Sequence, residues 1–170
     1  VRNSELTNLS AQIEKRRKRR AELNPENALG GQDLGFESQT AGESLKTPWV
    51  CAGNVEVLED AQSPFLNVHP LGTQGVRVGA GLRTDGVRYV FQPGLSTERD
   101  EAIHFNIDFR TAADAKDGSW RIYLGQGVVE SYAVEFSVSA KHIMLRNGGE
   151  WEKLIDATPG KWYSLQIEIN

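Results

Sequence analysis

Hydrophobic and polar residues alternate along much of the chain after residue 49. The clearest case is AIHFNIDFR, residues 102–110, in which an apolar side chain occupies every second position. SYAVEFSVS at 131–139 and WYSLQIEIN at 162–170 repeat this pattern. A period of two is typical of a β-strand that buries one face. Strands of this kind pair into antiparallel sheets with one face on a core and the other toward water.

Turn signals divide the rest of this region into further short strands, about ten in all. The predicted strands fall within 49–59, 65–70, 75–80, 87–92, 102–110, 119–127, 131–139, 141–147, 150–156 and 162–170. Gly53 and Asn54 interrupt the first, and a turn through Asn147 and Gly148 joins two others into a hairpin. No helix is predicted after residue 25, so nothing can serve as the crossover of a parallel sheet. The predicted fold class is therefore all-β: an antiparallel sandwich, jelly roll or barrel.

A different period governs the first part of the chain. Residues 4–23, SELTNLSAQIEKRRKRRAEL, place apolar side chains on one heptad seam, which two arginines interrupt. We expect an N-terminal helix within 1–23 that acts as a spacer, not as a strict coiled coil. Residues 24–48 are rich in Gly, Asn, Glu and Ser, and we expect a linker or an irregular segment there. The β-domain then occupies residues 49–170.

The net charge of −4 is spread unevenly over the 170 residues. Residues 1–23 hold seven basic and three acidic side chains, a net charge of +4, which leaves −8 for the remainder. An acidic body argues against nucleic acid as its partner. The basic run KRRKRR, residues 15–20, keeps one alternative open, a nucleic-acid contact made by the helix instead of an ordinary solvated helix face. No apolar run approaches the roughly 18–20 residues that a membrane-spanning helix needs.

Candidate catalytic residues are few. A glycoside hydrolase needs two carboxyl groups close together, and Asp108 and Glu135 could supply them if their strands were neighbours. Neither the alternating acidic pattern of such enzymes nor a G-x-S-x-G motif is present. Cys51 has no second cysteine and no histidine near it in the sequence, so we expect a half-buried apolar residue. We therefore predict no catalytic residues and keep a glycoside hydrolase as the alternative function.

Metal-ligating patterns are equally sparse. The three histidines lack the spacing of a metal site. The loop TAADAKDG, residues 111–118, contains Asp114 and Asp117, which are weak candidates for calcium because that ion needs clustered oxygens from loops. A plain surface turn is the alternative. We expect no cofactor, with calcium as the one ion that this loop could hold.

Ligand binding is the better supported expectation. A sugar site combines an aromatic face with planar polar groups. The candidates come from the polar phase of the central strands and from the turn near 147–149; they are His104, Asn106, Asp108, Arg121, Tyr123, Glu135 and Trp151. We expect Trp151 to be the most exposed of the four tryptophans and the others to lie mostly in the core. The alternative is that the polar residues form an ordinary solvated sheet face.

The last third of the chain resembles a known superfamily. A Pro-Gly turn leads into the strand G-K-W-Y-x-L-x-I, which is made by Gly160, Lys161, Trp162, Tyr163, Leu165 and Ile167. This strand is similar to one that recurs in the laminin-G-like branch of the concanavalin A-like lectin/glucanase superfamily, and the likeness covers residues 49–170. The resemblance implies a jelly-roll β-sandwich that serves as a non-catalytic binding or interaction module for a glycan or a protein. Calcium is common in the superfamily.

A narrower resemblance concerns the surroundings of the domain. A charged helical segment before a jelly roll looks like the insert domains of large exported bacterial proteins that carry cytochrome-c-like domains. This implies an extracellular or periplasmic location, with neighbouring domains of the same chain as partners. The closing strand, 162–170, lacks the usual protection of an edge strand, so we expect it in the middle of a sheet. We therefore also expect the β-domain to be truncated at its C-terminal end, within a larger multidomain protein.

Overall fold

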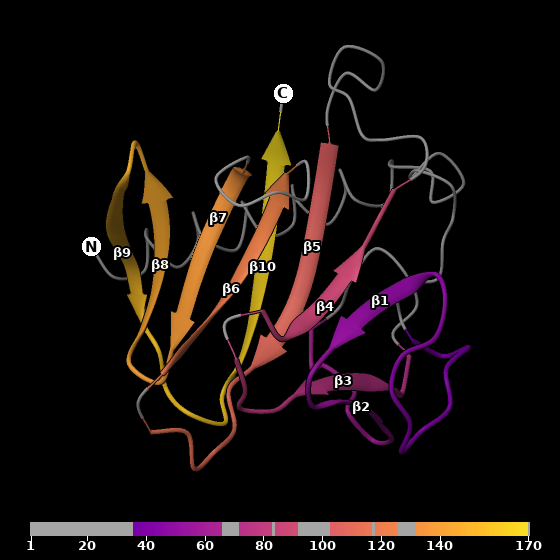
Figure 1. Ribbon diagram of the computed structural model, residues 1–170. Coiled ribbons are helices and arrows are strands. Elements are labelled where there is room, and N and C mark those ends of the chain that lie inside the picture. The colour runs from indigo at the N-terminus through magenta and orange to yellow at the C-terminus, as the bar shows by residue number, and fades with distance from the viewer. Residues whose placement is uncertain are drawn as a thin grey trace, which may run out of the picture. The chain divides into compact units, whose positions relative to one another are not determined.

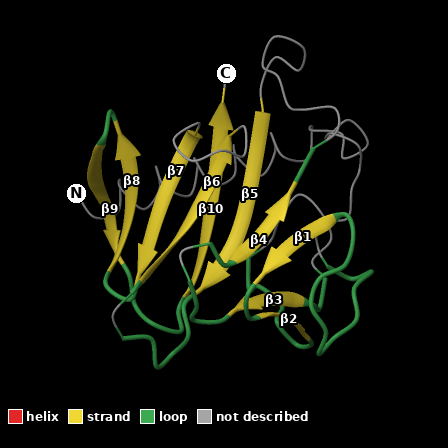
Figure 2. Ribbon diagram, viewed as in Figure 1, coloured by secondary structure: helices red, strands yellow, loops and turns green. Residues whose placement is uncertain are grey.

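The computed structural model describes residues 36–65, 72–82, 84–91, 103–116, 118–125 and 132–169. The predicted helix within 1–23 lies outside these ranges, as do residues 24–35 of the segment 24–48 and residues 66–70 of the predicted strand at 65–70. The described part is all-β, without a helix, and each pairing of strands in it is antiparallel (Figure 2). The chain divides into two compact units, Val1–Leu95 and Ser96–Asn170.

The first unit contains two short antiparallel ribbons. β1 (Trp49–Ala52) pairs with β4 (Gly86–Tyr89), and β2 (Val55–Leu58) pairs with β3 (Gly75–Val78). The predicted strand at 49–59 is broken between β1 and β2, as its glycine indicates. Gly53 has a φ of 77°, a left-handed conformation that favours glycine.

A small apolar core holds the ribbons of this unit. Val55 and Val57 of β2 are buried together with Leu45, which precedes β1. Half-buried side chains of β1, β3 and β4 pack against them, and Cys51 is one of these. The thiol of Cys51 lies 3.5 Å from the carbonyl oxygen of Leu45. Cys51 is thus the half-buried apolar residue that the sequence predicts.

The second unit contains two antiparallel sheets (Figure 1). β5 (Ile103–Arg110) pairs with β10 (Trp162–Ile169) along the full length of both strands. The other sheet is a meander of β6 (Ser119–Gly125), β7 (Tyr132–Ser139), β8 (His142–Asn147) and β9 (Glu150–Asp156). The predicted hairpin joins β8 to β9 through two glycines that both have positive φ, as a tight hairpin turn requires. The first and last strands of the unit therefore share one sheet, and the four strands between them form the other.

One apolar core lies between the two sheets of the second unit. Its buried side chains come from four strands and are Phe109, Ile122, Phe136, Val138 and Ile143. Phe109 of β5 stacks on Tyr163 of β10, with ring centroids 5.9 Å apart, and meets Trp120 of β6 edge-on at 5.3 Å. The inward side chains of β5 and β10 are the apolar phases that the sequence predicts. This layering is compatible with a β-sandwich.

β10 has a different position in its sheet from the one expected. Among the described strands it pairs with β5 alone, so the prediction that it lies between two neighbours is not met there. The alternation from Tyr163 to Ile169 reports that one face of the strand is buried. The alternation does not indicate how many strands pair with the backbone of β10. The absence of edge-protecting residues was therefore not sufficient to predict a neighbour on each side.

The tryptophans are also placed differently from the prediction. Trp120 is 37% exposed and is the one tryptophan counted among the exposed large side chains of the described residues. It belongs to the inward phase of β6 but lies at the start of the strand, where the core ends. Trp151 is half-buried. Trp162, expected in the core, is half-buried in the outward phase of β10.

Ile167 tests the placement of β10. Its side chain packs on the core of the second unit, whereas the adjacent Gln166 is exposed on the opposite face. We expect Ile167→Lys to lower the free energy of unfolding by about 2 kcal/mol or more, because apolar burial is lost and a charge faces the core. The matched control Gln166→Lys should change it by less than about 0.5 kcal/mol. Urea unfolding measures both, and equal effects would contradict the placement.

Candidate functional site

The predicted ligand residues separate into two groups on the two sheets of the second unit. His104, Asn106 and Asp108 belong to the outward phase of β5. The other group belongs to the outward phase of the four-stranded sheet: Arg121, Tyr123, Glu135 and Trp151. Because the opposite phases of both sheets meet in one core, the two groups point away from one another. The structure therefore does not bring the seven residues into a single site.

This separation removes the candidate pair of catalytic carboxylates. β5 pairs with β10, and β7 pairs with β6 and β8, so the strands of Asp108 and Glu135 are not neighbours. Packed sheets lie about 10 Å apart, and both side chains point outward from them. A glycosidase holds its two carboxyl groups within about 5–10 Å of each other in one cleft. The expectation that Asp108 and Glu135 could meet is therefore wrong.

The outward face of β5 and β10 is a polar surface whose side chains pair mostly with each other. Arg110 lies over the ring of Trp162, 5.1 Å from its centroid. Ser164 donates a hydrogen bond to the amide oxygen of Asn106 at 3.3 Å, and His104 lies 3.7 Å from a carboxylate oxygen of Glu168. Cross-strand pairs of this kind stabilise a sheet. This face has the character of the solvated sheet surface that was the alternative interpretation.

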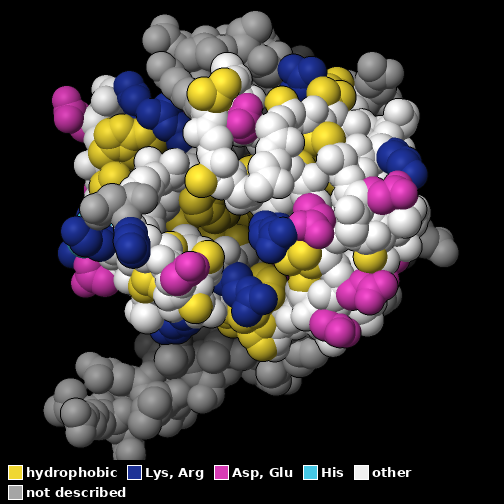
Figure 3. All heavy atoms as spheres, turned by 60° about the horizontal axis from the view of Figure 1, so that its bottom comes forward, with side chains coloured by type: hydrophobic (Ala, Val, Ile, Leu, Met, Phe, Trp, Pro, Cys, Tyr) yellow, Lys and Arg dark blue, Asp and Glu magenta, His cyan; other side chains and the backbone are white. Residues whose placement is uncertain are grey.

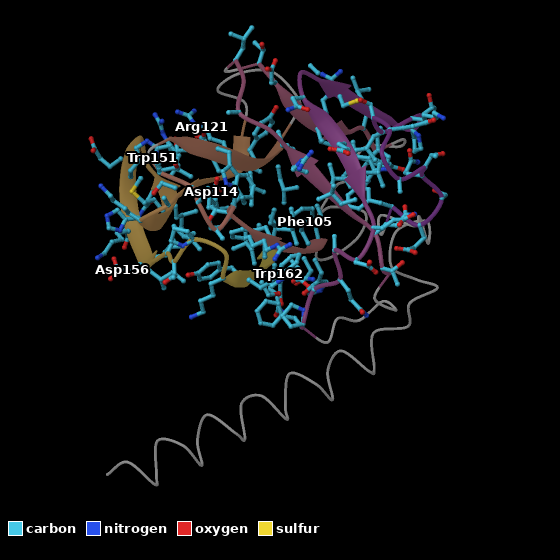
Figure 4. The ribbon with its side chains drawn as sticks, turned by 90° about the horizontal axis from the view of Figure 1, so that it is seen from below. Phe105, Asp114, Arg121, Trp151, Asp156 and Trp162 are labelled. Atoms are coloured by element: carbon cyan, nitrogen blue, oxygen red, sulfur yellow. The ribbon has the colours of Figure 1, made fainter. Side chains whose placement is uncertain are left out.

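The outward face of the four-stranded sheet carries a more unusual arrangement (Figure 4). Arg121 on β6 and Trp151 on β9 lie at opposite edges of the sheet, with β7 and β8 between them. Their side chains nevertheless meet, since the guanidinium carbon of Arg121 is 5.5 Å from the ring centroid of Trp151. Arg146 of β8, opposite Trp151 in the register, places its guanidinium carbon 5.4 Å from the same centroid. We call Arg121, Glu135, Arg146 and Trp151 the Trp151 cluster.

Arg121 and Trp151 together bridge the two middle strands of the sheet. Three strand spacings separate β6 from β9, about 14 Å, which two long side chains can span only by lying over β7 and β8. Two outward side chains of β7 are correspondingly buried: Glu135 is 2% exposed and Ser137 is 5% exposed. The outward phase of β7 was expected to be solvated like that of the other strands. It is buried because this bridge closes over a central strand.

Glu135 is held as a charged partner of Arg121. One of its carboxylate oxygens accepts a hydrogen bond from the guanidinium of Arg121 at 2.8 Å. A buried carboxylate is costly unless it is paired, so the position of Arg121 is tied to that of Glu135. The side chain of Arg121 remains 42% exposed. The guanidinium is thus fixed by Glu135 at the end of a side chain that is still partly exposed.

Arg146 was missed by sequence reasoning. The signal that could have found it is the hairpin register, because a two-glycine turn pairs Asn147 with Glu150 and then Arg146 with Trp151. The contact between Arg121 and Trp151 had no comparable signal. It depends on the order of four strands, which a period of two does not reveal.

A second charged group lies further along β9. The register between β8 and β9 shifts between Ile143 and Met144, and this irregularity brings Asp156 opposite His142. One carboxylate oxygen of Asp156 is 3.0 Å from the ammonium of Lys153 and 3.1 Å from Nδ1 of His142. The hydrogen bond and the charge of Lys153, followed by the hydrogen bond from His142, lower the pKa of Asp156 below its ordinary value of 3.8.

The described residues offer little for metal or covalent chemistry. Asp114 is exposed in a turn, and Asp117 lies outside the described residues, so the weak calcium candidates are not seen together. No group of three or more His, Cys, Asp or Glu side chains within the described ranges is placed to hold a metal ion. A cleft between the sheets of the second unit is lined mainly by apolar side chains, among them Ile143, Leu154 and Tyr163. Tyr163 is the one titratable side chain among the described residues of this lining, and its hydroxyl oxygen accepts a hydrogen bond from the backbone N–H of Thr158 at 2.8 Å.

Comparison with known proteins gives no match: no protein-family model matches the chain, and neither a curated protein nor a solved structure does. Among the residues that the structure describes, no helix is long and apolar enough to cross a membrane.

The pairing of Arg121 with Glu135 can be tested by stability measurements. Arg121→Met leaves a buried carboxylate without its cation, and we expect the free energy of unfolding to fall by about 2–3 kcal/mol, less than for a fully buried pair because Arg121 is partly exposed. The double variant Arg121→Met/Glu135→Leu should recover most of the loss. Denaturant unfolding measures the free energy of unfolding of both variants and of the parent. A single variant as stable as the parent would show that Glu135 is not held in this way.

Asp156 provides a test by titration. Its lowered pKa means that its interactions stabilise the folded state above pH 3.8 and lose this effect as the pH falls through the lowered value. We expect a carboxyl titration followed by NMR to place the pKa of Asp156 below 3.8, and Lys153→Gln to raise it. Lys141→Gln, which removes a nearby charge that does not contribute to this shift, is the control. An unchanged pKa in Lys153→Gln would contradict the assigned cause.

Proposed function

We propose that the chain is a non-catalytic binding module of the concanavalin A-like, laminin-G-like class, which binds a glycan through the outward face of its four-stranded sheet. The observation that carries the proposal is the Trp151 cluster. There a tryptophan ring and two guanidinium groups are brought together from β6, β8 and β9. A protein ligand is the competing partner, and the experiment below separates the two.

The arrangement of the second unit supports the fold part of the proposal. The chain crosses from β5 to the four-stranded sheet and returns from β9 to β10, so its two sheets exchange strands twice. The stretch 160–167, on which the resemblance rests, forms the turn and most of β10. A jelly roll requires crossings of this kind between two packed antiparallel sheets.

Two observations favour binding over catalysis. The outward carboxylates Asp108 and Glu135 belong to different sheets, and Glu135 is both buried and paired with a cation. A buried, paired carboxylate is poorly placed to transfer a proton to a substrate. Glu135 instead has the role of a support that holds Arg121 in place.

The composition of the Trp151 cluster suits a sugar better than an apolar ligand. Arginine supplies planar N–H donors, and both guanidinium groups lie over the aromatic ring of Trp151. Tyr123, 43% exposed, adds a second aromatic side chain in the outward phase of β6. Few rotamers need to be ordered on binding, because the guanidinium groups already lie against the ring.

A glycan array probed with the labelled protein tests this function. We expect at least one glycan class to bind, without release of new reducing ends during incubation. Trp151→Ala should lower the affinity at least about tenfold, as expected for the loss of a central aromatic contact. Thermal unfolding of Trp151→Ala serves as the check that the variant is folded.

Trp162→Ala is the matched control, because Trp162 also lies under an arginine but on the other sheet. Binding lost in Trp162→Ala and kept in Trp151→Ala would move the site to the face of β5 and β10. Binding to no glycan on the array would overturn the glycan proposal in favour of a protein partner.

A further inference from the structure

We infer that the Trp151 cluster recognises an acidic glycan, and that Arg121 and Arg146 contact its anionic groups. This inference rests on the proposed function, which it deepens by naming the chemical class of the ligand. Carboxylate groups of uronic acids are the expected anions. Sulfate esters offer similar oxygen acceptors and form a separate arm of the test.

The first argument is the charge of this face. The titratable side chains in the outward phase of β6–β9 are Arg121, Tyr123, Arg146, Lys153, Glu135, Asp156 and His142. Glu135 and Asp156 are each paired within the sheet, with Arg121 and with Lys153 and His142 respectively. Cations thus outnumber anions on this face, although the whole chain has a net charge of −4. On the left side of Figure 3, basic side chains border hydrophobic ones, and acidic side chains lie among them.

The second argument is the preorganisation of the two guanidinium groups. Both lie within 5.5 Å of the centroid of the same indole ring, which is attractive to cations on its faces. Arg121 is fixed further by Glu135 at 2.8 Å. A guanidinium binds a carboxylate through two parallel N–H···O contacts, and a group already held in place loses less entropy in doing so.

The third argument is that the carboxylates of the outward face pair with cations other than Arg146. Arg146 is exposed, and it is the next-to-last residue of β8, with its guanidinium over the ring of Trp151. The acidic residues next to Trp151 in the sequence, Glu150 and Glu152, belong to the other phase of β9, and Glu152 accepts a hydrogen bond from Asn147. A ligand that reaches Trp151 from the outward side therefore meets arginine before it meets carboxylate.

An acidic glycan fits these observations better than a nucleic acid. Binding to a phosphate backbone depends on many cations along one surface, and the body of this protein is acidic. The Trp151 cluster supplies two arginines around one ring, which suits a chain that carries an anionic group at intervals along neutral sugar rings. The Trp151 cluster also differs from a purely apolar docking face, because its two guanidinium groups favour a ligand with anionic oxygens.

Isothermal titration calorimetry of the full chain tests the inference with polygalacturonate, heparin, neutral dextran, poly-glutamate and single-stranded DNA as probes. We expect polygalacturonate to bind and neutral dextran not to bind, with binding that weakens as salt is added. Arg146→Gln should weaken polygalacturonate binding about tenfold, and Arg146→Lys should restore only part of it because lysine lacks the planar fork. Arg110→Gln is the matched control, since Arg110 stacks on Trp162 of the other sheet, and it should have no effect.

The outcomes separate the two proposals. Heparin bound in place of polygalacturonate, with the same loss in Arg146→Gln, keeps the anionic ligand and assigns it to sulfate. Neutral dextran bound as well as polygalacturonate, or no response to Arg146→Gln, overturns the inference while a glycan-binding module stands. Binding of poly-glutamate or DNA with no glycan bound overturns both proposals.

Discussion

The apolar layer between the two sheets of the second unit decides where the other side chains of that unit can point. Phe109, Phe136 and Val138 meet there from both sheets, so the alternate residues on the same strands must face outward. The separation of His104, Asn106 and Asp108 from the Trp151 cluster follows directly. The outward side chains of the two sheets therefore form two separate surfaces, and a site built from them belongs to one sheet or the other.

Much of the local structure could be predicted from the sequence. The alternation in β5, β7 and β10, the break at Gly53 and the hairpin before Trp151 are all consequences of short stretches of chain. What escaped prediction depends on pairings between distant residues. β5 and β10 are joined residue by residue although Arg110 and Trp162 lie far apart in the sequence, and no period along the chain records that choice.

The candidate site shows the same limit. Residue types alone indicated Arg121, Glu135 and Trp151, but they also suggested a solvated Glu135 within reach of Asp108. The burial of Glu135 depends on two side chains that reach over β7 and β8 from opposite edges. The burial of Glu135 depends on the length of these side chains and on the order of the strands. A sequence shows the length of a side chain but not the order of the strands. The role of Glu135 accordingly changes from a candidate ligand-binding residue to a support for Arg121.

The irregular register between β8 and β9 has a consequence for how this surface could have evolved. Lys153 and Asp156 are three positions apart, and in a regular strand an odd spacing sends two side chains to opposite faces. The one-residue shift near Leu154 returns Asp156 to the side of Lys153, where both reach one another and His142. Loss of the codon for Leu154 would leave the hairpin turn and Trp151 unaltered and would make the ladder regular, with Ile155 and Asp156 still opposite Ile143 and His142. The outward groups at the two ends of this strand, Trp151 at one and Asp156 at the other, can thus be kept whether or not the extra residue is present.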